Sequence, residues 1–152
     1  MYGANTSPRY GHKSRKWCIM KIKKINHIAV AVEDIVQAAA FWQEVLGLEL
    51  EHVEEVESQH AKVAFFPCGE SEVELVEPTD PESGTAKFIQ NRGAGIHHLC
   101  LEVEDIDAAL QELKEKGVRL INETALVEEG RKMAFIHPKS SGGVLLELYQ
   151  II

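Results

Sequence analysis

The feature that most constrains the fold of this 152-residue chain is an internal repeat. Residues 26–35 align without gaps on residues 97–106, at an offset of 71 residues. Each copy continues with an apolar-periodic stretch that ends at a glycine, Gly47 in the first copy and Gly117 in the second. One such unit could hardly bury both faces of its own sheet, so repeated units bury a shared core. We therefore expect two similar halves that complete each other.

Each unit is predicted to contain one strand, one helix and three further strands. Ile28 and Val30 alternate with His27, which is the period of two of a half-buried strand. Asp34 can then cap a helix, and Asp105 has the same place in the second unit. The later strands are expected at residues 62–67, 72–76, 133–137 and 144–149, and a short helical turn at residues 86–90.

These patterns predict an α+β fold of two tandem βαβββ modules, residues 22–80 and 93–150, whose curved mixed sheets surround a common cleft. Alternate side chains of a strand point to opposite faces, so helices on one face leave the other free to line the cleft. The residues of the first strand on that free face are His27, Ala29 and Ala31. The small alanines are expected to leave room for a ligand there.

Four polar residues occupy equivalent places in the two units. His27 and His98 lie in the two first strands, and Glu74 and Glu147 lie in the two last strands. An ionised glutamate inside an apolar strand costs several kcal/mol unless it is paired or metal-bound. A divalent cation removes that cost, and this donor set suits Co²⁺, Ni²⁺, Mn²⁺ or Zn²⁺. His97 is expected on the opposite face of its strand, as a supporting or structural residue.

The charge of the chain is unevenly distributed. Sixteen Lys and Arg against twenty-four Asp and Glu give a net charge of −8, yet residues 1–24 contain seven basic residues and no acid. This segment lacks the apolar region of a secretory signal. Its lack of acids is similar to a mitochondrial transit peptide, but it has little amphipathic pattern. We interpret residues 1–21 as a disordered basic extension, or a translated leader ahead of Met20, in preference to a targeting segment. The acidic remainder argues against a nucleic-acid partner. No apolar run reaches the roughly 18–20 residues of a membrane span, so no membrane partner is expected.

The three cysteines, Cys18, Cys68 and Cys100, lie far apart in the chain and form no C-x-x-C pair. An odd number of scattered cysteines is typical neither of a disulfide framework nor of a cysteine-zinc site. The pattern favours a reducing compartment, and we expect a cytoplasmic protein.

Paired βαβββ modules with His and Glu at these places resemble the vicinal oxygen chelate (glyoxalase, bleomycin resistance and dioxygenase) superfamily. Within it, three segments are most similar to the methylmalonyl-CoA epimerase family, namely residues 25–32, 95–103 and 134–148. The resemblance covers about residues 22–150 and implies a glyoxalase-like fold with a metal in the cleft. It also implies an isomerase that interconverts (R)- and (S)-methylmalonyl-CoA by proton transfer at C2 through a metal-stabilised enolate.

The resemblance further implies roles for single residues. The implied metal ligands are His27, Glu74, His98 and Glu147. Glu147 is also expected to exchange the C2 proton. The implied contacts with the acyl-CoA substrate are Lys139, Ser140 and Ser141. We expect one divalent ion, Co²⁺ before Ni²⁺, Mn²⁺ or Zn²⁺, and a homodimer.

Two other functions stay open at this point. A glyoxalase I-type isomerase (lactoylglutathione lyase) has nearly the same ligands, although residues 137–140 are more similar to the epimerases. A non-catalytic small-molecule-binding module of the same fold is the second alternative, although such modules commonly lack the ligands that are present here. Some epimerases have glutamine in place of Glu74, and some relatives carry a carboxylate on the strand at residues 61–65. This chain has no acid in that strand, which leaves the second proton carrier open.

Overall fold

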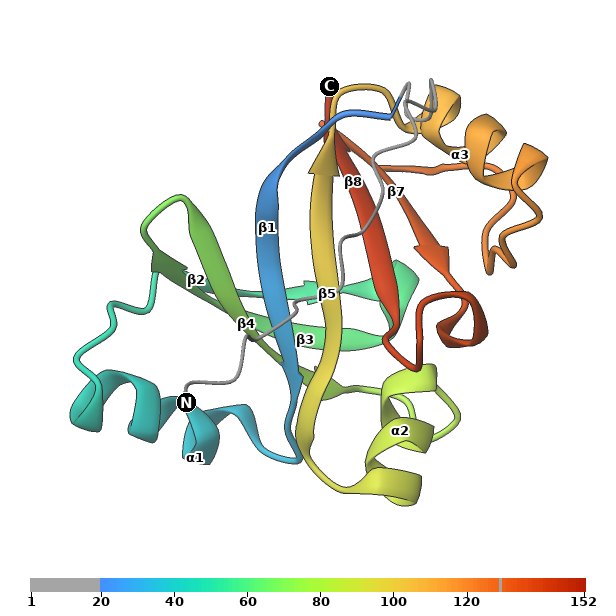
Figure 1. Cartoon of the computed structure of the whole chain (residues 1–152). Coiled ribbons are helices and arrows are strands. Elements are labelled where there is room, and N and C mark those ends of the chain that lie inside the picture. The colour runs from blue at the N-terminus through green and yellow to red at the C-terminus, as the bar shows by residue number, and fades with distance from the viewer. Residues whose placement is uncertain (1–19, 129) are drawn as a thin grey trace, which may run out of the picture.

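The computed structural model describes residues 20–128 and 130–152. In these ranges eight strands form one sheet, and three α-helices lie against it (Figure 1). The helices are Ile35–Ala40 (α1), Gly84–Arg92 (α2) and Ile106–Glu115 (α3). The strands are Ile22–Ala31 (β1), His52–Val56 (β2), Ala61–Cys68 (β3), Ser71–Pro78 (β4), Gly95–Val103 (β5), Leu126–Glu128 (β6), Arg131–Ile136 (β7) and Leu146–Ile151 (β8).

The strand order is symmetric about the middle of the sheet. It runs β2-β3-β4-β1-β5-β8-β7-β6, so the two first strands of the repeat, β1 and β5, lie side by side. They are antiparallel to each other, whereas each is parallel to the last strand of its own half, β4 or β8. Figure 1 shows α1 and α3 at opposite ends of this arrangement. A pseudo-two-fold axis between β1 and β5 therefore relates the halves.

This architecture confirms the predicted α+β fold of two βαβββ units around a curved mixed sheet. The predicted strands at residues 62–67 and 72–76 fall within β3 and β4. Strand β7 ends at Ile136, one residue before the predicted end, and β8 begins at Leu146, two residues after the predicted start. Most of the predicted basic extension, residues 1–19, lies outside the described residues, and its boundary stays a prediction. Of its last two residues, Met20 donates its backbone N–H to Glu112 (2.8 Å). No helix of the described ranges is long and apolar enough to cross a membrane.

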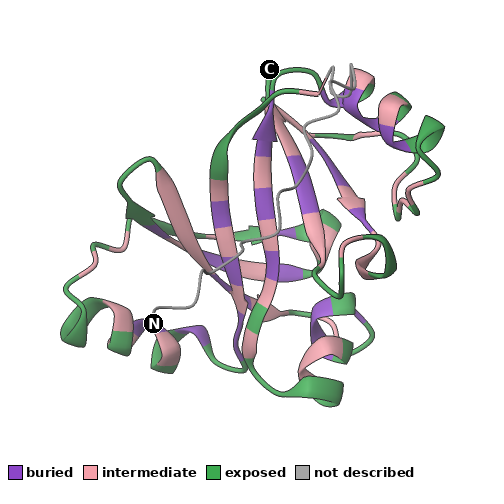
Figure 2. Cartoon of the chain, in the orientation of Figure 1, coloured by how far each residue is buried: buried purple, intermediate pink, exposed green. Residues whose placement is uncertain are grey.

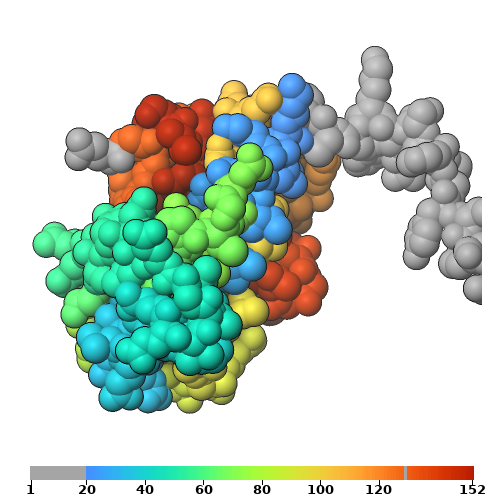
Figure 3. All heavy atoms as spheres, turned by 90° about the vertical axis from the view of Figure 1, so that its left-hand side faces the viewer, coloured from blue at the N-terminus to red at the C-terminus, as the bar shows by residue number. Residues whose placement is uncertain are grey.

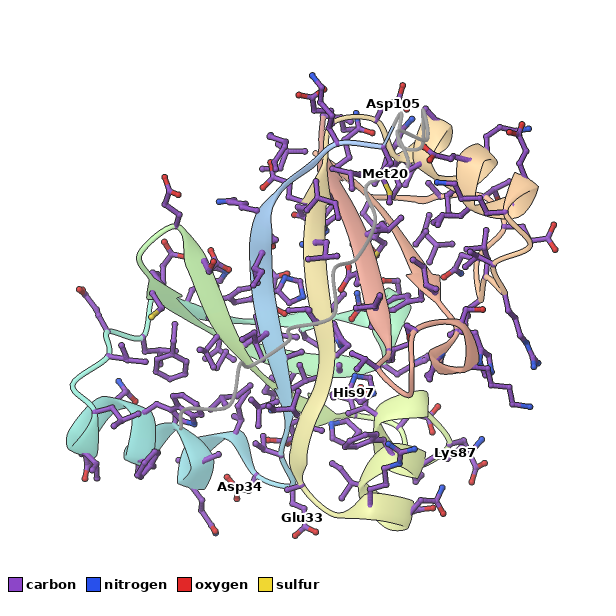
Figure 4. The ribbon with its side chains drawn as sticks, in the orientation of Figure 1. Met20, Glu33, Asp34, Lys87, His97 and Asp105 are labelled. Carbon is purple, nitrogen blue, oxygen red and sulfur yellow. The ribbon has the colours of Figure 1, made fainter. Side chains whose placement is uncertain are left out.

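The two helices of the repeat begin in the same way. Oδ1 of Asp34 accepts hydrogen bonds from the first turn of α1, and Oδ1 of Asp105 accepts one from Ala108 of α3. Figure 4 labels both aspartates, each at the start of its helix. Side chains of the last strands supply a second acceptor each: Glu77 binds the N–H of Ile35, and Gln150 binds that of Ile106. These bonds satisfy N–H groups that a helix leaves free at its start.

The core on the helix-covered face forms two clusters, one in each half. In the first, Ile35 and Ala39 of α1 pack on Phe66 and Leu75 of the sheet. In the second, α3 packs on Val103, Ala134, Ile136 and Leu148. The purple bands along β1 and β5 in Figure 2 mark other buried residues of the sheet, such as Ala29 and Cys100. Figure 3 shows the side of the first half, where α1 and β2 face the viewer.

The opposite, concave face differs from the prediction near β1. Ala29 and Ala31 are fully buried and line none of the cavities described below. Val56, Val63 and Val76 pack on Ala29, because the curved strands β2, β3 and β4 bring apolar side chains over it. The expected space beside these alanines is therefore filled by core. Only the His27 end of this strand face opens to a cavity.

Candidate metal and active site

The centre of the sheet places each histidine opposite a small residue of the other half. In the β1/β5 pair, His27 lies opposite Cys100 and Ala29 lies opposite His98. Ala29 and Cys100 are equivalent in the repeat, and both are fully buried. Their small side chains leave space above the strands, so that the two imidazole rings meet across the pseudo-two-fold axis. The ring centroids are 5.2 Å apart.

Three of the four predicted ligands converge on one point. Nε2 of His27 lies 3.1 Å from Nε2 of His98. Oε2 of Glu147 lies 3.2 Å from the first nitrogen and 2.9 Å from the second, and all three residues are buried. Two ligand atoms about 2.0–2.2 Å from a metal are about 2.8–3.6 Å from each other at tetrahedral or octahedral angles. The triangle therefore has the size that a first-row cation requires.

The fourth predicted ligand, Glu74, contacts the cluster from another side. Its Oε1 lies 3.2 Å from Nδ1 of His27, whereas the triangle is formed by Nε2. Burial raises the pKa of Glu74 to about 7, and the charge of Glu147 adds to the rise although His27 opposes it. A bound cation requires a deprotonated carboxylate, so metal and proton compete at Glu74.

Glu147 has the opposite protonation behaviour. Burial by itself would raise its pKa, but hydrogen bonds from His27 and His98 outweigh burial and lower the pKa to about 2. The pKa of His27 is raised in turn: burial lowers it, but the hydrogen bond with Glu147 and the charge of Glu74 prevail. Glu147 is thus ionised at neutral pH, the state that both a metal ligand and a proton acceptor need.

A thiol lies beside the triangle. Potential ligand atoms of His27, Cys100 and Glu147 all lie within 4.8 Å of one another. Burial raises the pKa of the Cys100 thiol far above its usual range. Because the thiolate is the form that binds metals, the protonated thiol contributes little as a ligand here. Sequence reasoning treated Cys100 only as a free cysteine, although its place opposite His27 follows from the repeat.

His97 does not point to the opposite face of β5, and that prediction was wrong. The pairing steps from Ala29–His98 to Val30–Ile96, so His97 is an extra residue in a β-bulge. Its ring lies beside that of His98, with the two Nδ1 atoms 2.9 Å apart (His97 is labelled in Figure 4). Burial lowers the pKa of His97 to about 4, so its ring is neutral at physiological pH.

A polar cavity of about 230 Å³ adjoins the cluster. Besides the predicted residues, it is lined by Gln59, Arg131 and Tyr149, which the sequence analysis did not single out. Alternation along the last strand from Glu147 would have placed Tyr149 on this face. Gln59 lies in a 3₁₀ turn, Glu57–Gln59, that no periodicity marks. Arg131 is held by Glu128, with Nη2 2.7 Å from Oε2.

Two adjoining apolar cavities, of about 470 and 280 Å³, open on the other side of His98. Both are lined by His97, His98, Ile121 and Leu145. The larger one is also bordered by Phe88 and by segments of the loop before β8. The site therefore has a polar side near Arg131 and an apolar side near α2.

The predicted substrate loop lies at the rim of the larger cavity. His137, Pro138 and Gly143 line it, whereas Lys139, Ser140 and Ser141 are not among the lining residues. Oγ of Ser140 accepts a hydrogen bond from the backbone of Arg119 (2.9 Å), and the hydroxyl of Ser141 donates to carbonyls of the loop itself. The two serines thus hold the loop together here, and Lys139 is exposed.

Comparison with known proteins agrees with this architecture. The sequence profile of the Glyoxalase/Bleomycin resistance protein/Dioxygenase superfamily matches residues 26–135. The chain belongs to this superfamily.

Relatives of known name match most of the chain. It is 37% identical to the mitochondrial methylmalonyl-CoA epimerase of Homo sapiens over 87% of this chain and 76% of that protein. It is 38% identical to the ethylmalonyl-CoA/methylmalonyl-CoA epimerase of Cereibacter sphaeroides over 86% of this chain and 99% of that protein. Among solved structures, the methylmalonyl-CoA epimerase of Mycobacterium tuberculosis is 36% identical with a TM-score of 0.80, covering 86% of this chain and 89% of that one. A methylmalonyl-CoA epimerase in complex with methylmalonyl-CoA and NH4+ is 30% identical with the same TM-score, covering 86% and 96%.

Proposed function

We propose that this protein is an epimerase of methylmalonyl-CoA, which removes the C2 proton from one face and returns it on the other. The observation that carries the proposal is the convergence of His27, His98 and Glu147, with ligand atoms within 3.2 Å of one another. They lie between two cavities in a chain that resembles epimerases over most of its length. An enzyme with this activity is an isomerase.

The donor set fits one divalent cation. Two imidazole nitrogens and a carboxylate oxygen at the observed spacing suit Co²⁺, Ni²⁺, Mn²⁺ or Zn²⁺, and we propose Co²⁺. Glu74, the remaining carboxyl of the cluster, is half-buried and is the proposed fourth ligand. When bound, the cation would supply a Lewis acid that stabilises negative charge developing on the substrate.

Residues of the chain are proposed to transfer the proton and to bind the anionic substrate. Glu147 is ionised and buried at the centre of the cluster, so it can accept the C2 proton and give it back. A general base in this position contributes about 10²–10⁴-fold to a proton transfer. Arg131 places a cation in the wall of the polar cavity, where it complements an anionic substrate. The cluster is buried and borders the polar cavity.

The apolar side of the site is the proposed path of the acyl-CoA chain. The cavity beside His98 is bordered by the loop before β8, and we keep Lys139, Ser140 and Ser141 as proposed substrate contacts. A carboxylate or phosphate group can pair with the exposed ammonium of Lys139. Movement of this loop would be needed before the serine hydroxyls exchange their present partners for substrate.

Assembly and location complete the proposal. We infer a homodimer, since closed two-fold dimers are the commonest symmetric oligomers. Light scattering at micromolar concentration tests this, because the mass of a single chain, 17.0 kDa, would contradict it.

We infer a cytoplasmic location from the free cysteines Cys68 and Cys100. Fractionation of cells tests it.

The decisive experiment for the function is deuterium exchange at C2 of methylmalonyl-CoA in D₂O, followed by mass spectrometry. We expect exchange with Co²⁺, loss of exchange after chelation and recovery when Co²⁺ is returned. A folded, metal-loaded protein that catalyses no exchange would contradict the proposal. Conversion of a glutathione hemithioacetal in its place would favour the glyoxalase I-type alternative, and absence of both activities would favour a binding module.

A further inference from the structure

Three register shifts interrupt the β1/β5 pair, and the two nearest the cluster are β-bulges on either side of the pseudo-two-fold axis. In β1 the pairing steps from Ile25–Leu101 to His27–Cys100, which leaves Asn26 as an extra residue. In β5 the bulge described above leaves His97 as the extra residue. Asn26 and His97 are equivalent in the sequence repeat, and each immediately precedes a histidine of the cluster. Bulges next to functional sites re-aim side chains.

The side chain of Asn26 is fixed between two partners. Its Nδ2 donates to Oε2 of Glu102 at 3.3 Å, and its Oδ1 lies 2.9 Å from Nδ1 of His27. Glu102 is buried and paired with Lys23, so its charge holds the amide in this orientation. The atom turned to His27 is thus the carbonyl oxygen, which only accepts hydrogen bonds. The hydrogen between them belongs to Nδ1 of His27, whose other neighbour, Oε1 of Glu74, lies farther away at 3.2 Å.

The ring of His97 is fixed by helix α2. It packs edge-on against Phe88, with centroids 4.9 Å apart, and the guanidinium of Arg92 lies over the same phenyl ring. Its Nδ1 faces Nδ1 of His98 at 2.9 Å. Of two facing nitrogens one donates and the other accepts. When Nε2 of His98 gives its lone pair to a cation, Nδ1 of the neutral ring carries the hydrogen, and His97 accepts it.

We propose that Asn26 and His97 are paired positioning residues that accept the Nδ1 hydrogens of His27 and His98 and so keep both Nε2 lone pairs directed at the proposed cation. The inference rests on the metal site of the proposed function. A histidine whose other nitrogen donates a hydrogen bond is fixed in tautomer and ring orientation, and it is a more basic ligand. Both halves thus contain an acceptor for the Nδ1 hydrogen of the metal-binding histidine, which is an amide oxygen in one half and an imidazole nitrogen in the other.

The positioning role of Asn26 and His97 is tested by measuring the metal affinity of variants of the full-length protein. We expect Asn26→Ala and His97→Ala each to weaken Co²⁺ binding by about 10–100-fold, as loss of such partners typically does. Competition with a chromogenic chelator measures this without recourse to activity. His97→Asn copies the residue of the other half and supplies an oxygen acceptor, so this variant should retain most of the affinity.

A matched control separates positioning from general loss of stability. Gln150→Ala also removes an amide oxygen that accepts a hydrogen bond, from Ile106 on the helix-covered face. It should lower the melting temperature of the metal-free protein but leave Co²⁺ affinity at the parental value. Long-range ¹H–¹⁵N spectra of the parent with Zn²⁺ give a second readout. They should show protonated Nδ1 and metal-bound Nε2 in both His27 and His98.

The outcomes are distinguishable. Alanine variants that bind Co²⁺ as tightly as the parent, or a His97→Asn variant as weak as His97→Ala, would overturn the positioning role. The spectrum of the parent decides if an alanine variant fails to fold, because Nδ1-bound metal in either ring also overturns the proposal. If the parent binds no metal, the proposed function fails. The metal-free spectrum then still tests the Asn26 contact. Nδ1 of His27 should carry a hydrogen, with or without a second hydrogen on the Nε2 that faces Glu147, and an Nδ1 without a hydrogen contradicts the contact.

Discussion

Glu74 and Glu147 occupy the same place in the two halves, yet their environments are opposite. Each lies in the last strand of its half, beside a phenylalanine of the adjacent strand, Phe65 or Phe135. Burial raises the pKa of Glu74 to about 7, whereas two histidine hydrogen bonds overcome burial at Glu147 and lower its pKa to about 2. Equivalent positions in a repeat therefore need not carry the same charge.

The difference has a geometric cause. Oε2 of Glu147 lies within 3.2 Å of Nε2 atoms from both halves, so two imidazoles stabilise its ionised form. Glu74 reaches Nδ1 of His27 alone, a nitrogen that Asn26 also contacts. The pseudo-symmetry of the backbone is thus lost at the level of hydrogen bonds. It leaves Glu147 ionised by its histidine partners, whereas Glu74 holds a proton up to about neutral pH unless a cation binds.

The largest expected effect separates the two glutamates by activity. Glu147→Gln retains an oxygen that can coordinate a metal but loses the basicity. We expect it to keep much of its Co²⁺ and to lose most C2 exchange, by about 10²–10⁴-fold. Glu74→Gln should remain active, because some epimerases are expected to have glutamine there. Metal content and deuterium exchange are measured on the same samples.

Two results would remove this distinction. If activity of Glu147→Gln follows its metal content and recovers in excess Co²⁺, then Glu147 is only a ligand. If both variants retain metal and are equally inactive, the two positions are chemically equivalent after all. Melting curves of both proteins must agree before their activities are compared, because each substitution changes a buried group.

A smaller effect concerns stability of the metal-free protein against pH. The pKa of Glu74 rises from 4.5 in its reference state to about 7 when folded. Between these values the folded protein holds a proton that the unfolded chain has released, so the free energy of unfolding falls as pH rises. Glu74→Gln removes this loss. The free energy of unfolding of the variant should exceed that of the parent by about 1–3 kcal/mol at pH 8, and the two should differ little at pH 4.

Urea unfolding with a chelator present measures both proteins across this pH range. Glu72→Gln is the matched control, since Glu72 lies two residues earlier in β4 and also lines the polar cavity. A stability difference between Glu74→Gln and the parent that stays constant from pH 4 to pH 8 would show that Glu74 does not titrate in this way. Added Co²⁺ should reverse the order at pH 8, because the carboxylate then gains a partner.

The smallest expected effect compares the two helix starts. Glu77 accepts from Ile35 at 2.7 Å with a charged oxygen, and Gln150 accepts from Ile106 at 2.8 Å with a neutral one. Hydrogen bonds to charged groups contribute about 1.5–3 kcal/mol and neutral ones about 0.5–1.5 kcal/mol. Glu77→Ala should therefore lower the free energy of unfolding more than Gln150→Ala does. We expect a loss near the lower end of the range for charged groups, about 1.5 kcal/mol, because Glu77 is half-buried.

Salt sharpens this last comparison. The negative charge of Glu77 lies at the positive end of α1, an interaction that added salt screens. The cost of Glu77→Ala in urea unfolding should shrink at 1 M NaCl, while that of Gln150→Ala should not. Equal costs at low salt would mean that the charge of Glu77 contributes nothing at this helix.

Much of the fold could be predicted from local patterns. Alternation at Ile28 and Val30, the caps Asp34 and Asp105, and the repeat itself predicted the strands, the helices and the pairing of halves that the sheet displays. These features are local or periodic, so the sequence carries them directly. The same alternation, with the repeat, predicted that His27, His98 and Glu147 would meet.

What only the tertiary structure decided depends on contacts between distant strands. The bulge at His97 arises from the register of β5 against β1, so strict alternation placed this ring on the wrong face. Ala29 is buried because the curvature of the sheet brings Val56 and Val63 over it, which no periodicity encodes. The opposite pKa shifts of Glu74 and Glu147 depend on hydrogen bonds that differ in direction within a nearly symmetric backbone. Sequence symmetry sets which residues meet, and side-chain geometry after folding sets their charge.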